Sequence, residues 1–211
     1  MATAACGGGP RAAAQGTASP STTGASAAGD AARVSRVSVP ANVADVQFMT
    51  GMISHHAQAL VMAGWAPSHG AGASVSTLAE RIVGGQRDEI VTMQSWLRDH
   101  GLPVPDAKPG PMMMTMGGMT HAMMMPGMLS DEQMKELDAA HGAVFDRLFL
   151  TFMIQHHRGA VAMVQALFDT NGAAQEQSVF KLASDVSADQ TTEIARMQRM
   201  LAPYLQAGRA P

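Results

Sequence analysis

The sequence predicts an all-α fold, an antiparallel four-helix bundle made of two similar helical hairpins. Three observations lead there: an internal repeat, apolar side chains at helical spacing in four segments, and stop or capping signals between those segments. The bundle is expected over residues 41–205. Its first hairpin spans 43–100, a linker follows over 101–129, and the second hairpin spans 130–205. Short connections within each half favour antiparallel neighbours.

The repeat pairs residues 48–56 with residues 149–157 at an offset of 101, and six of the nine positions are identical, including both histidines. A second match pairs the Gln, Glu, Ile, Met and Leu positions of 86–97 with those of 190–201 at an offset of 104. Each half therefore has the same order: a His-His helix, a loop, and a helix carrying Gln, Glu and Met.

The first and third helices share one face, on which residues recur at i, i+4, i+7, i+11 and i+14. These positions hold Phe48, Met52, His55, Ala59 and Met62 in the first half and Phe149, Met153, His156, Ala160 and Met163 in the second. The second and fourth helices have shorter apolar stripes, namely Ile90, Met93 and Leu97, then Ile194, Met197 and Leu201. No segment has the alternation typical of strands.

Helix boundaries follow from local chemistry. Glycine and proline stop helices, and a capping box starts one. These signals are Pro40 before the first helix, Gly64 to Pro67 after it, Gly101 after the second, Ser130 to Gln133 at the start of the third, Asn171-Gly172 after it, and Pro203 at the end of the fourth.

The linker contains nine methionines and one histidine within residues 112–128, interrupted by glycine and proline. No helical or strand period fits it, so we expect an irregular segment. Such a segment is also typical of an apolar flap packed on the bundle or of a docking surface for another protein. Because leucine and phenylalanine are nearly absent from it, we favour metal capture by thioether sulfur.

Residues 1–40 are almost entirely Ala, Gly, Ser, Thr and Pro and are expected to form a disordered tether. The single cysteine, Cys6, has small residues before it and glycines after it, a context similar to the end of a bacterial lipoprotein signal. This predicts an extracytoplasmic protein, periplasmic or at the cell surface, with a lipid anchor at Cys6 as its membrane contact. The alternative is that Cys6 is incidental in the tail.

Composition excludes several function classes. A net charge of −3 and a pI near 6.2 give no basic surface for nucleic acid or anionic lipid. A lone cysteine excludes a thiolate cluster within one chain. The anomaly is 19 methionines beside six phenylalanines and two tryptophans. Methionine is a soft, neutral ligand that favours monovalent copper.

The doubled His-His pairs, each with a methionine one turn away, predict metal sites in the bundle interior. Ordinary core packing is the alternative for a single His or Met, but recurrence in both halves favours a ligand role. Glu89 and Glu193 are candidates to orient a histidine from behind. The expected ligands are Met52, His55, His56, Met93, Met153, His156, His157 and Met197 in the helices, and Met112, Met113, Met114, Met116, Met119, His121, Met123, Met124, Met125 and Met128 in the linker.

The pattern of Asp45, Phe48, Met52-Ile53, His55-His56 and Met62, followed by Gln86, Glu89-Ile90, Met93 and Trp96-Leu97, resembles the family named domain of unknown function 305. The second copy and Met125-Pro126-Gly127-Met128 resemble it equally well, so the likeness covers about residues 43–205. The resemblance implies a ferritin-like four-helix bundle exported from the bacterial cytoplasm, with copper or silver bound through Met and His in some members.

The expected function is therefore extracytoplasmic binding of Cu(I) or Ag(I), in copper resistance or delivery, with metal ions and a second copper-handling protein as partners and no nucleic acid. We expect no catalytic activity. Two alternatives stay open at this point. One is a metal-dependent oxidase of ferritin-like fold, although Glu-x-x-His motifs are absent. The other is a protein-interaction module that binds no metal.

Overall fold

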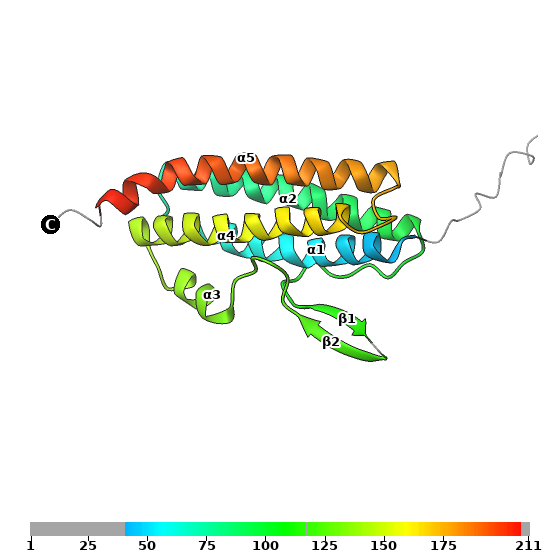
Figure 1. The fold of residues 1–211 in the computed structure, drawn as a ribbon. Helices are drawn as coiled ribbons and strands as arrows, with labels where there is room; N and C mark the ends of the chain where they lie inside the picture. The colour runs from blue at the N-terminus through cyan, green and yellow to red at the C-terminus, as the bar shows by residue number, and fades with distance from the viewer. Residues whose placement is uncertain (1–40, 117, 208–211) are drawn as a thin grey trace, which may run out of the picture. The chain divides into compact units, whose positions relative to one another are not determined.

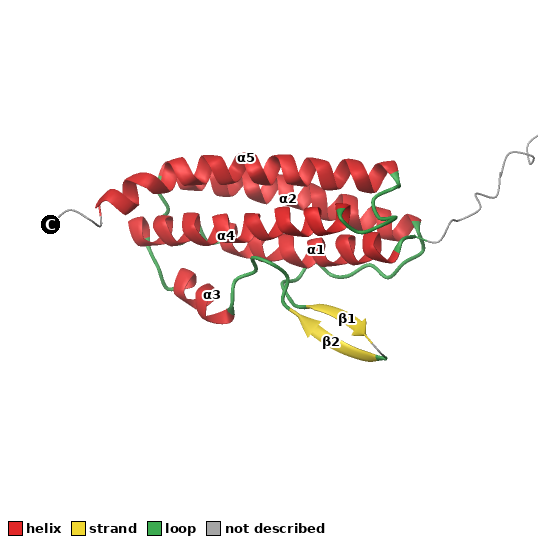
Figure 2. Ribbon diagram, viewed as in Figure 1, coloured by secondary structure: helices red, strands yellow, loops and turns green. Residues whose placement is uncertain are grey.

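A computed structural model describes residues 41–116 and 118–207 of the chain, without the side chains of residues 114–116 and 121. The tether predicted for residues 1–40, including Cys6, lies outside the described residues. The described part is predominantly helical, as expected, with five helices and one short β-hairpin (Figure 2). Over these two ranges, no helix is both long and apolar enough to cross a membrane.

Four long helices lie side by side (Figure 1). Helix α1 (Val43–Gly64) packs against α2 (Ala73–Asp99), and α4 (Gly142–Phe168) packs against α5 (Gln177–Ala207). Helix α1 also packs against α4, so the two helix pairs meet through their histidine-bearing members. The two pairs correspond to the two halves of the repeat, and a short connection reverses the chain within each pair.

Two repeat-related aspartates tie the pairs together. The Asp45 carboxylate on α1 accepts a hydrogen bond from the backbone N–H of Ala174, 2.7 Å away and just before α5. The Asp146 carboxylate on α4 accepts from the backbone N–H of Gly72, the N-cap residue of α2, at 3.1 and 3.2 Å. Unpaired N–H groups at a helix start favour negative charge, so Asp146 stabilises the start of α2, while Asp45 holds the loop that leads into α5.

The apolar core forms two clusters, one toward each end of the helices. The first contains the later part of α1 and the earlier part of α4, including Met62 and Phe149. The second contains the earlier part of α1 and the later part of α4, including Phe48 and Val164. The His-His pairs lie along α1 and α4 between the segments that supply these two clusters. A polar layer therefore interrupts an otherwise apolar interior.

Two predicted boundaries were wrong. The capping box at Ser130 starts a separate short helix, α3 (Asp131–Asp138), and the long helix α4 begins only at Gly142. Gly142 has a φ of +56°, which breaks the chain direction between them. Pro203 lies inside α5, which continues to Ala207. Proline there removes only one backbone hydrogen bond, and it does so in the last two turns of α5, where the helix is largely exposed.

The linker is not wholly irregular, contrary to expectation. Strands β1 (Met112–Met116) and β2 (Met119–Met123) form an antiparallel hairpin in which Met112 pairs with Met123 and Met116 with Met119. Gly118, with a φ of +81°, supports the tight turn. In β1 the successive residues Met112 and Met113 lie on opposite faces, which removes the alternation that would have revealed the strand.

Candidate metal centre

Four buried histidines form the centre of the site. His55 and His56 lie on α1 and His156 and His157 on α4, each with an exposed fraction of 0%. The rings of His55 and His156 meet across the helix contact, with centroids 3.9 Å apart. We call these four residues the histidine layer. Their burial fits the sequence prediction that both pairs point inward.

Each imidazole has a partner at its Nε2 atom. His55 lies 3.0 Å from the backbone oxygen of Pro126, and His156 lies 3.0 Å from the backbone oxygen of His55. His56 lies 2.6 Å from Glu89 Oε2, and His157 lies 2.7 Å from Glu193 Oε2. A carbonyl or carboxylate oxygen only accepts hydrogen bonds, so Nε2 donates in all four cases.

The tautomers leave four nitrogens without partners. A neutral imidazole that donates from Nε2 has a lone pair at Nδ1. The Nδ1 atoms of all four histidines are buried, and none has a hydrogen-bond partner among the described residues. An unsatisfied buried acceptor costs about 1–3 kcal/mol, and native proteins contain few of them. A cation that accepts these lone pairs would remove that penalty.

Burial keeps two of the rings neutral. Burial, followed by the neighbouring His56, lowers the pKa of His55 to about 3. Burial, followed by His55 and His157, holds the pKa of His156 well below its ordinary value. At neutral pH both rings therefore keep free lone pairs, which metal binding requires.

Glu89 on α2 and Glu193 on α5 hold His56 and His157 from the side opposite Nδ1, as the sequence suggested for these two carboxylates. A carboxylate behind a histidine fixes its tautomer and raises its basicity. Sequence reasoning missed Asp189, whose pKa is raised by burial and by the nearby charges of Glu89 and Glu193. These three carboxylates give the site a negative field favourable to a cation.

Gln86 and Gln190 are further residues to which the sequence assigned no role beyond the repeat. Both are buried, and the Oε1 atom of each lacks a hydrogen-bond partner in the described part of the chain, as does Nε2 of Gln86. They precede Glu89 and Glu193 by three residues, so they lie one helical turn away on the same face. Their equal spacing in the two halves was the signal that could have identified them.

The predicted helix methionines are all buried. Met52 and Met93 belong to the apolar cluster on one side of the histidine layer, and Met153 and Met197 belong to the cluster on the other. Among the described residues, no three His, Cys, Asp or Glu side chains are arranged to hold a metal ion by themselves. An ion in this interior would therefore draw on methionine sulfur as well as imidazole, a donor set suited to soft ions.

A segment of the linker, Met125 to Leu129, lies on α1 and α4, and we call it the strap. Besides accepting from His55 through Pro126, it is held at Leu129 by the Gln58 amide, which accepts from the Leu129 N–H at 2.8 Å and donates to its oxygen at 3.1 Å. Gly159 makes the close approach possible, because a Cβ there would lie 1.9 Å from the Pro126 oxygen.

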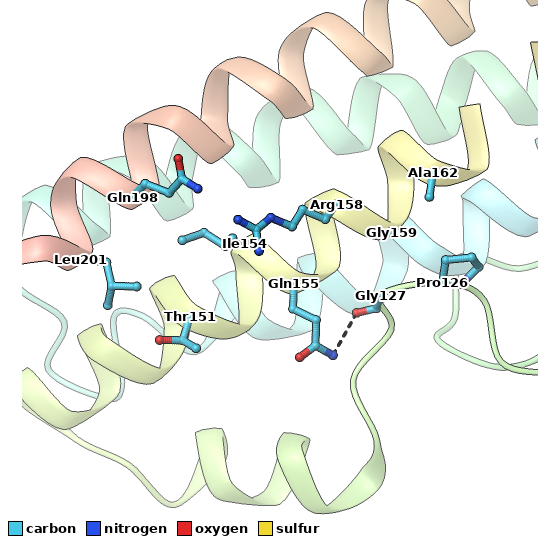
Figure 3. Close-up of a pocket in the computed structure, with 10 residues that line it drawn as sticks. All are labelled: Pro126, Gly127, Thr151, Ile154, Gln155, Arg158, Gly159, Ala162, Gln198 and Leu201. Atoms are coloured by element: carbon cyan, nitrogen blue, oxygen red, sulfur yellow. Dashed lines mark hydrogen bonds between the residues drawn. The ribbon is translucent and has the colours of Figure 1, made fainter. Parts of the chain in front are cut away.

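Beside the strap lies an open pocket of about 670 Å³ between α4 and α5 (Figure 3). Gln155 points from α4 toward the strap and donates to the Gly127 oxygen at 3.4 Å, and Arg158 is one helical turn further. The four buried histidines are not among the lining residues, so this pocket does not open onto the imidazoles. The histidine layer is therefore an interior feature that lies apart from this pocket.

The structure separates the predicted linker ligands into groups. Met125 and Met128 are buried in the strap and Met112 is half-buried, whereas four methionines are exposed: Met113, Met119, Met123 and Met124. The side chains of Met114, Met116 and His121 lie outside the described residues. The linker therefore does not bring its described methionines into a single cluster, and its two buried methionines, Met125 and Met128, both belong to the strap.

Three further histidines, outside the histidine layer, have structural partners. His69 contacts the Asp138 backbone oxygen at 2.8 Å and stacks on His141, and His100 lies 3.1 Å from Glu176. These contacts join α3 to the loop after α1, and the end of α2 to the start of α5.

Fold and site together define a predominantly helical protein with a buried, repeat-related histidine layer. Residues 45–201 match the model of the family called domain of unknown function 305, DUF305, and the chain belongs to that family. This confirms the resemblance noted in the sequence. No functionally curated protein matches the chain.

Several solved structures are similar. A DUF305 protein from Streptomyces coelicolor, named as a candidate secreted protein, is 30% identical, covering 76% of this chain and 93% of its own, with a TM-score of 0.65. A DUF305 fragment from Deinococcus radiodurans is 29% identical, covering 78% and 99%, with a TM-score of 0.64. CopM in its Cu(I)-bound form is 27% identical, covering 76% and 96%, with a TM-score of 0.57. CopM has also been solved with Cu(II) and with silver.

Proposed function

We propose that this protein binds soft metal ions, Cu(I) or Ag(I), in the interior of its helices, and that it serves in extracytoplasmic copper resistance or delivery rather than in catalysis. The observation that carries the proposal is the set of four buried Nδ1 atoms that have no hydrogen-bond partner among the described residues. Their Nε2 atoms are all committed to oxygen acceptors, so the free nitrogens are poised as ligands.

The donor set supports soft rather than hard ions. Methionine sulfur lies on both sides of the histidine layer, and no cluster of oxygen and nitrogen ligands alone is present among the described residues. A di-iron oxidase needs bridging carboxylates. Here Glu89 and Glu193 are already bonded to imidazoles, which favours an orienting role for them.

The similar structures support the same proposal. CopM was crystallised with Cu(I), Cu(II) and silver, and a similar protein is named as a secreted candidate. Transfer of these properties to this chain gives a copper carrier outside the cytoplasm. The arrangement of α1, α2, α4 and α5 in two pairs is consistent with the ferritin-like antiparallel four-helix bundle that we propose for the fold.

The test is a titration of the purified protein with Cu(I) against a competing chelator, with Zn(II) and Fe(II) in parallel. Variants His55→Leu/His56→Leu and His156→Leu/His157→Leu remove one half of the layer each while filling its volume. We expect tight Cu(I) binding that each double variant reduces, with weak Zn(II) and Fe(II) binding. Absence of competitive Cu(I) and Ag(I) binding would refute the proposal and favour an interaction module.

A further inference from the structure

The base of the hairpin places two thioether sulfurs over a single point on α1. A Cβ atom at Gly51 would lie 3.1 Å from the Met112 sulfur and 3.2 Å from the Met125 sulfur. The terminal methyl carbon of Met163, from α4, lies 3.4 Å from the same point. Three methionine side chains from β1, the strap and α4 therefore meet above one glycine.

Gly51 leaves the space that these side chains occupy. Its repeat partner, 101 residues later, is Phe152, whose ring is buried on α4. The second half of the repeat is thus filled by an aromatic side chain where the first half is open. The opening exists in one half alone, the half that the hairpin contacts.

The two sulfurs are held by the fold around them. Met125 is buried, and the next residue, Pro126, accepts the hydrogen bond from His55. Met112 begins β1 and pairs with Met123 at the hairpin base. Side chains fixed in this way lose little freedom when they bind an ion, which favours affinity.

The Met112 and Met125 sulfurs lie close to the histidine layer along α1. Gly51 precedes His55 by four residues on α1, which is about one helical turn. Met125 is joined to His55 through the Pro126 carbonyl. An ion held by the two sulfurs would stand beside the only linker segment that contacts a buried imidazole among the described residues.

We propose that Met112 and Met125, seated over Gly51 with Met163 as a third donor, form a separate thioether site for Cu(I) or Ag(I) that passes ions inward to the histidine layer. This proposal rests on the proposed function. It names the point of entry and the residues that receive the ion. Thioethers are neutral and bind soft ions without losing a proton. The ion keeps its oxidation state as it passes from sulfur to imidazole, so the transfer needs no redox partner.

The test uses Ag(I), which undergoes no redox change in the experiment, and three versions of the full chain. Met112→Leu/Met125→Leu removes both sulfurs at nearly constant volume. Met134→Leu/Met200→Leu is the matched control, because neither sulfur is among the predicted ligands and both side chains pack against the apolar cluster at the other end of the helices. Bound Ag(I) is counted by chelator competition, the rate of loading by stopped flow, and the fold by circular dichroism.

We expect Met112→Leu/Met125→Leu to lose one Ag(I) and to load the histidine layer at least tenfold more slowly, with an unchanged circular dichroism spectrum. The control keeps the wild-type stoichiometry and rate. Equal stoichiometry and rate in all three proteins would overturn the entry site while leaving the histidine layer in place. Failure of the wild-type chain to bind Ag(I) at all would remove the proposed function, and this inference with it. Gly51→Ala gives an independent check, because its Cβ displaces both sulfurs without removing them.

Discussion

The Nε2 atom of His156 lies 3.0 Å from the backbone oxygen of His55, its partner 101 residues earlier in the repeat. His55 does not return this bond to His156 and instead donates to the oxygen of Pro126, also at 3.0 Å. A carbonyl of the linker thus takes the place that the repeat would give to α4. The symmetry of the two halves breaks at this contact, which joins the strap to the histidine layer.

The strap depends on the absence of a side chain at Gly159. Gly159→Ala would place a Cβ 1.9 Å from the Pro126 oxygen, so main chain must move. We expect the free energy of unfolding to fall by about 1–3 kcal/mol, as for other overpacked sites. Gly84→Ala is the control, since nothing lies within 4 Å of its Cβ. That variant should gain about 0.5–1 kcal/mol through helix propensity. Urea unfolding measures both, and equal effects would argue against the close approach.

Glu89 and Glu193 should control metal affinity without binding the ion. Replacing Glu89 by Ala frees the tautomer of His56, and loss of such partners typically lowers affinity about 10–100-fold. Glu89→Gln keeps an oxygen that accepts from Nε2 and should retain most of the affinity. Glu80→Ala, on the exposed face of the same helix, is the control. Chelator competition with Cu(I) measures all three, and an unaffected Glu89→Ala variant would rule out this role.

The metal-free protein should lose stability as the pH falls. The pKa of His55 is about 3 in the folded chain, against an ordinary value of 6.5. Below pH 6.5, His55 binds a proton in the unfolded chain but stays neutral in the folded chain. The folding free energy that His55 contributes above pH 6.5 is therefore lost progressively toward pH 3. By pH 5 the loss is on the order of 2 kcal/mol.

Urea unfolding of the metal-free chain between pH 7.5 and pH 5 gives the slope. His55→Met removes one of the two buried titrating groups and should reduce the slope, whereas His55→Met/His156→Met removes both and should flatten the profile. A wild-type profile that is flat over this range would contradict the neutral, buried state of His55.

Tyr204 reports on the aspartate that holds the start of α2. Its hydroxyl donates to Asp146 Oδ2 at 2.7 Å, and burial, together with this carboxylate, raises the Tyr204 pKa to about 12. Because Tyr204 is the only tyrosine, its phenolate absorbance is a clean signal. Asp146→Ala should lower the midpoint toward 10 and also reduce stability through the lost bonds to Gly72. An unchanged midpoint would show that the pair is not formed.

The helices were predictable because each carries an apolar stripe and the repeat doubles the evidence. The burial of both His-His pairs and the bonds to Glu89 and Glu193 also followed from helical spacing. The breaks between helices were harder to predict. Ser130 and Gln133 form the capping box that the sequence predicts. A capping box marks where a helix starts but not how long the helix is, so it cannot distinguish the eight-residue α3 from a long helix.

The hairpin and the strap could not be found by periodicity. Consecutive methionines at 112 and 113 conceal β1, and the pairing of β1 with β2 depends on a turn at Gly118, whose φ is +81°. The Pro126–His55 bond joins residues 71 positions apart, and no local rule predicts it. By itself Gly51 gives no signal in the sequence. Its repeat partner is Phe152, and this difference between the two halves is what marks the position.

The most direct test of the account concerns which imidazole nitrogen binds the ion. Chain labelled with ¹⁵N at histidine is compared by NMR before and after one-step addition of Ag(I), with resonances assigned from the two histidine-pair variants. We expect the Nδ1 resonances of the histidine layer to shift when Ag(I) binds. Each Nε2 should stay protonated, because each donates to an oxygen acceptor. Shifts at Nε2, or no change at any of the four rings while Ag(I) is bound, would contradict it.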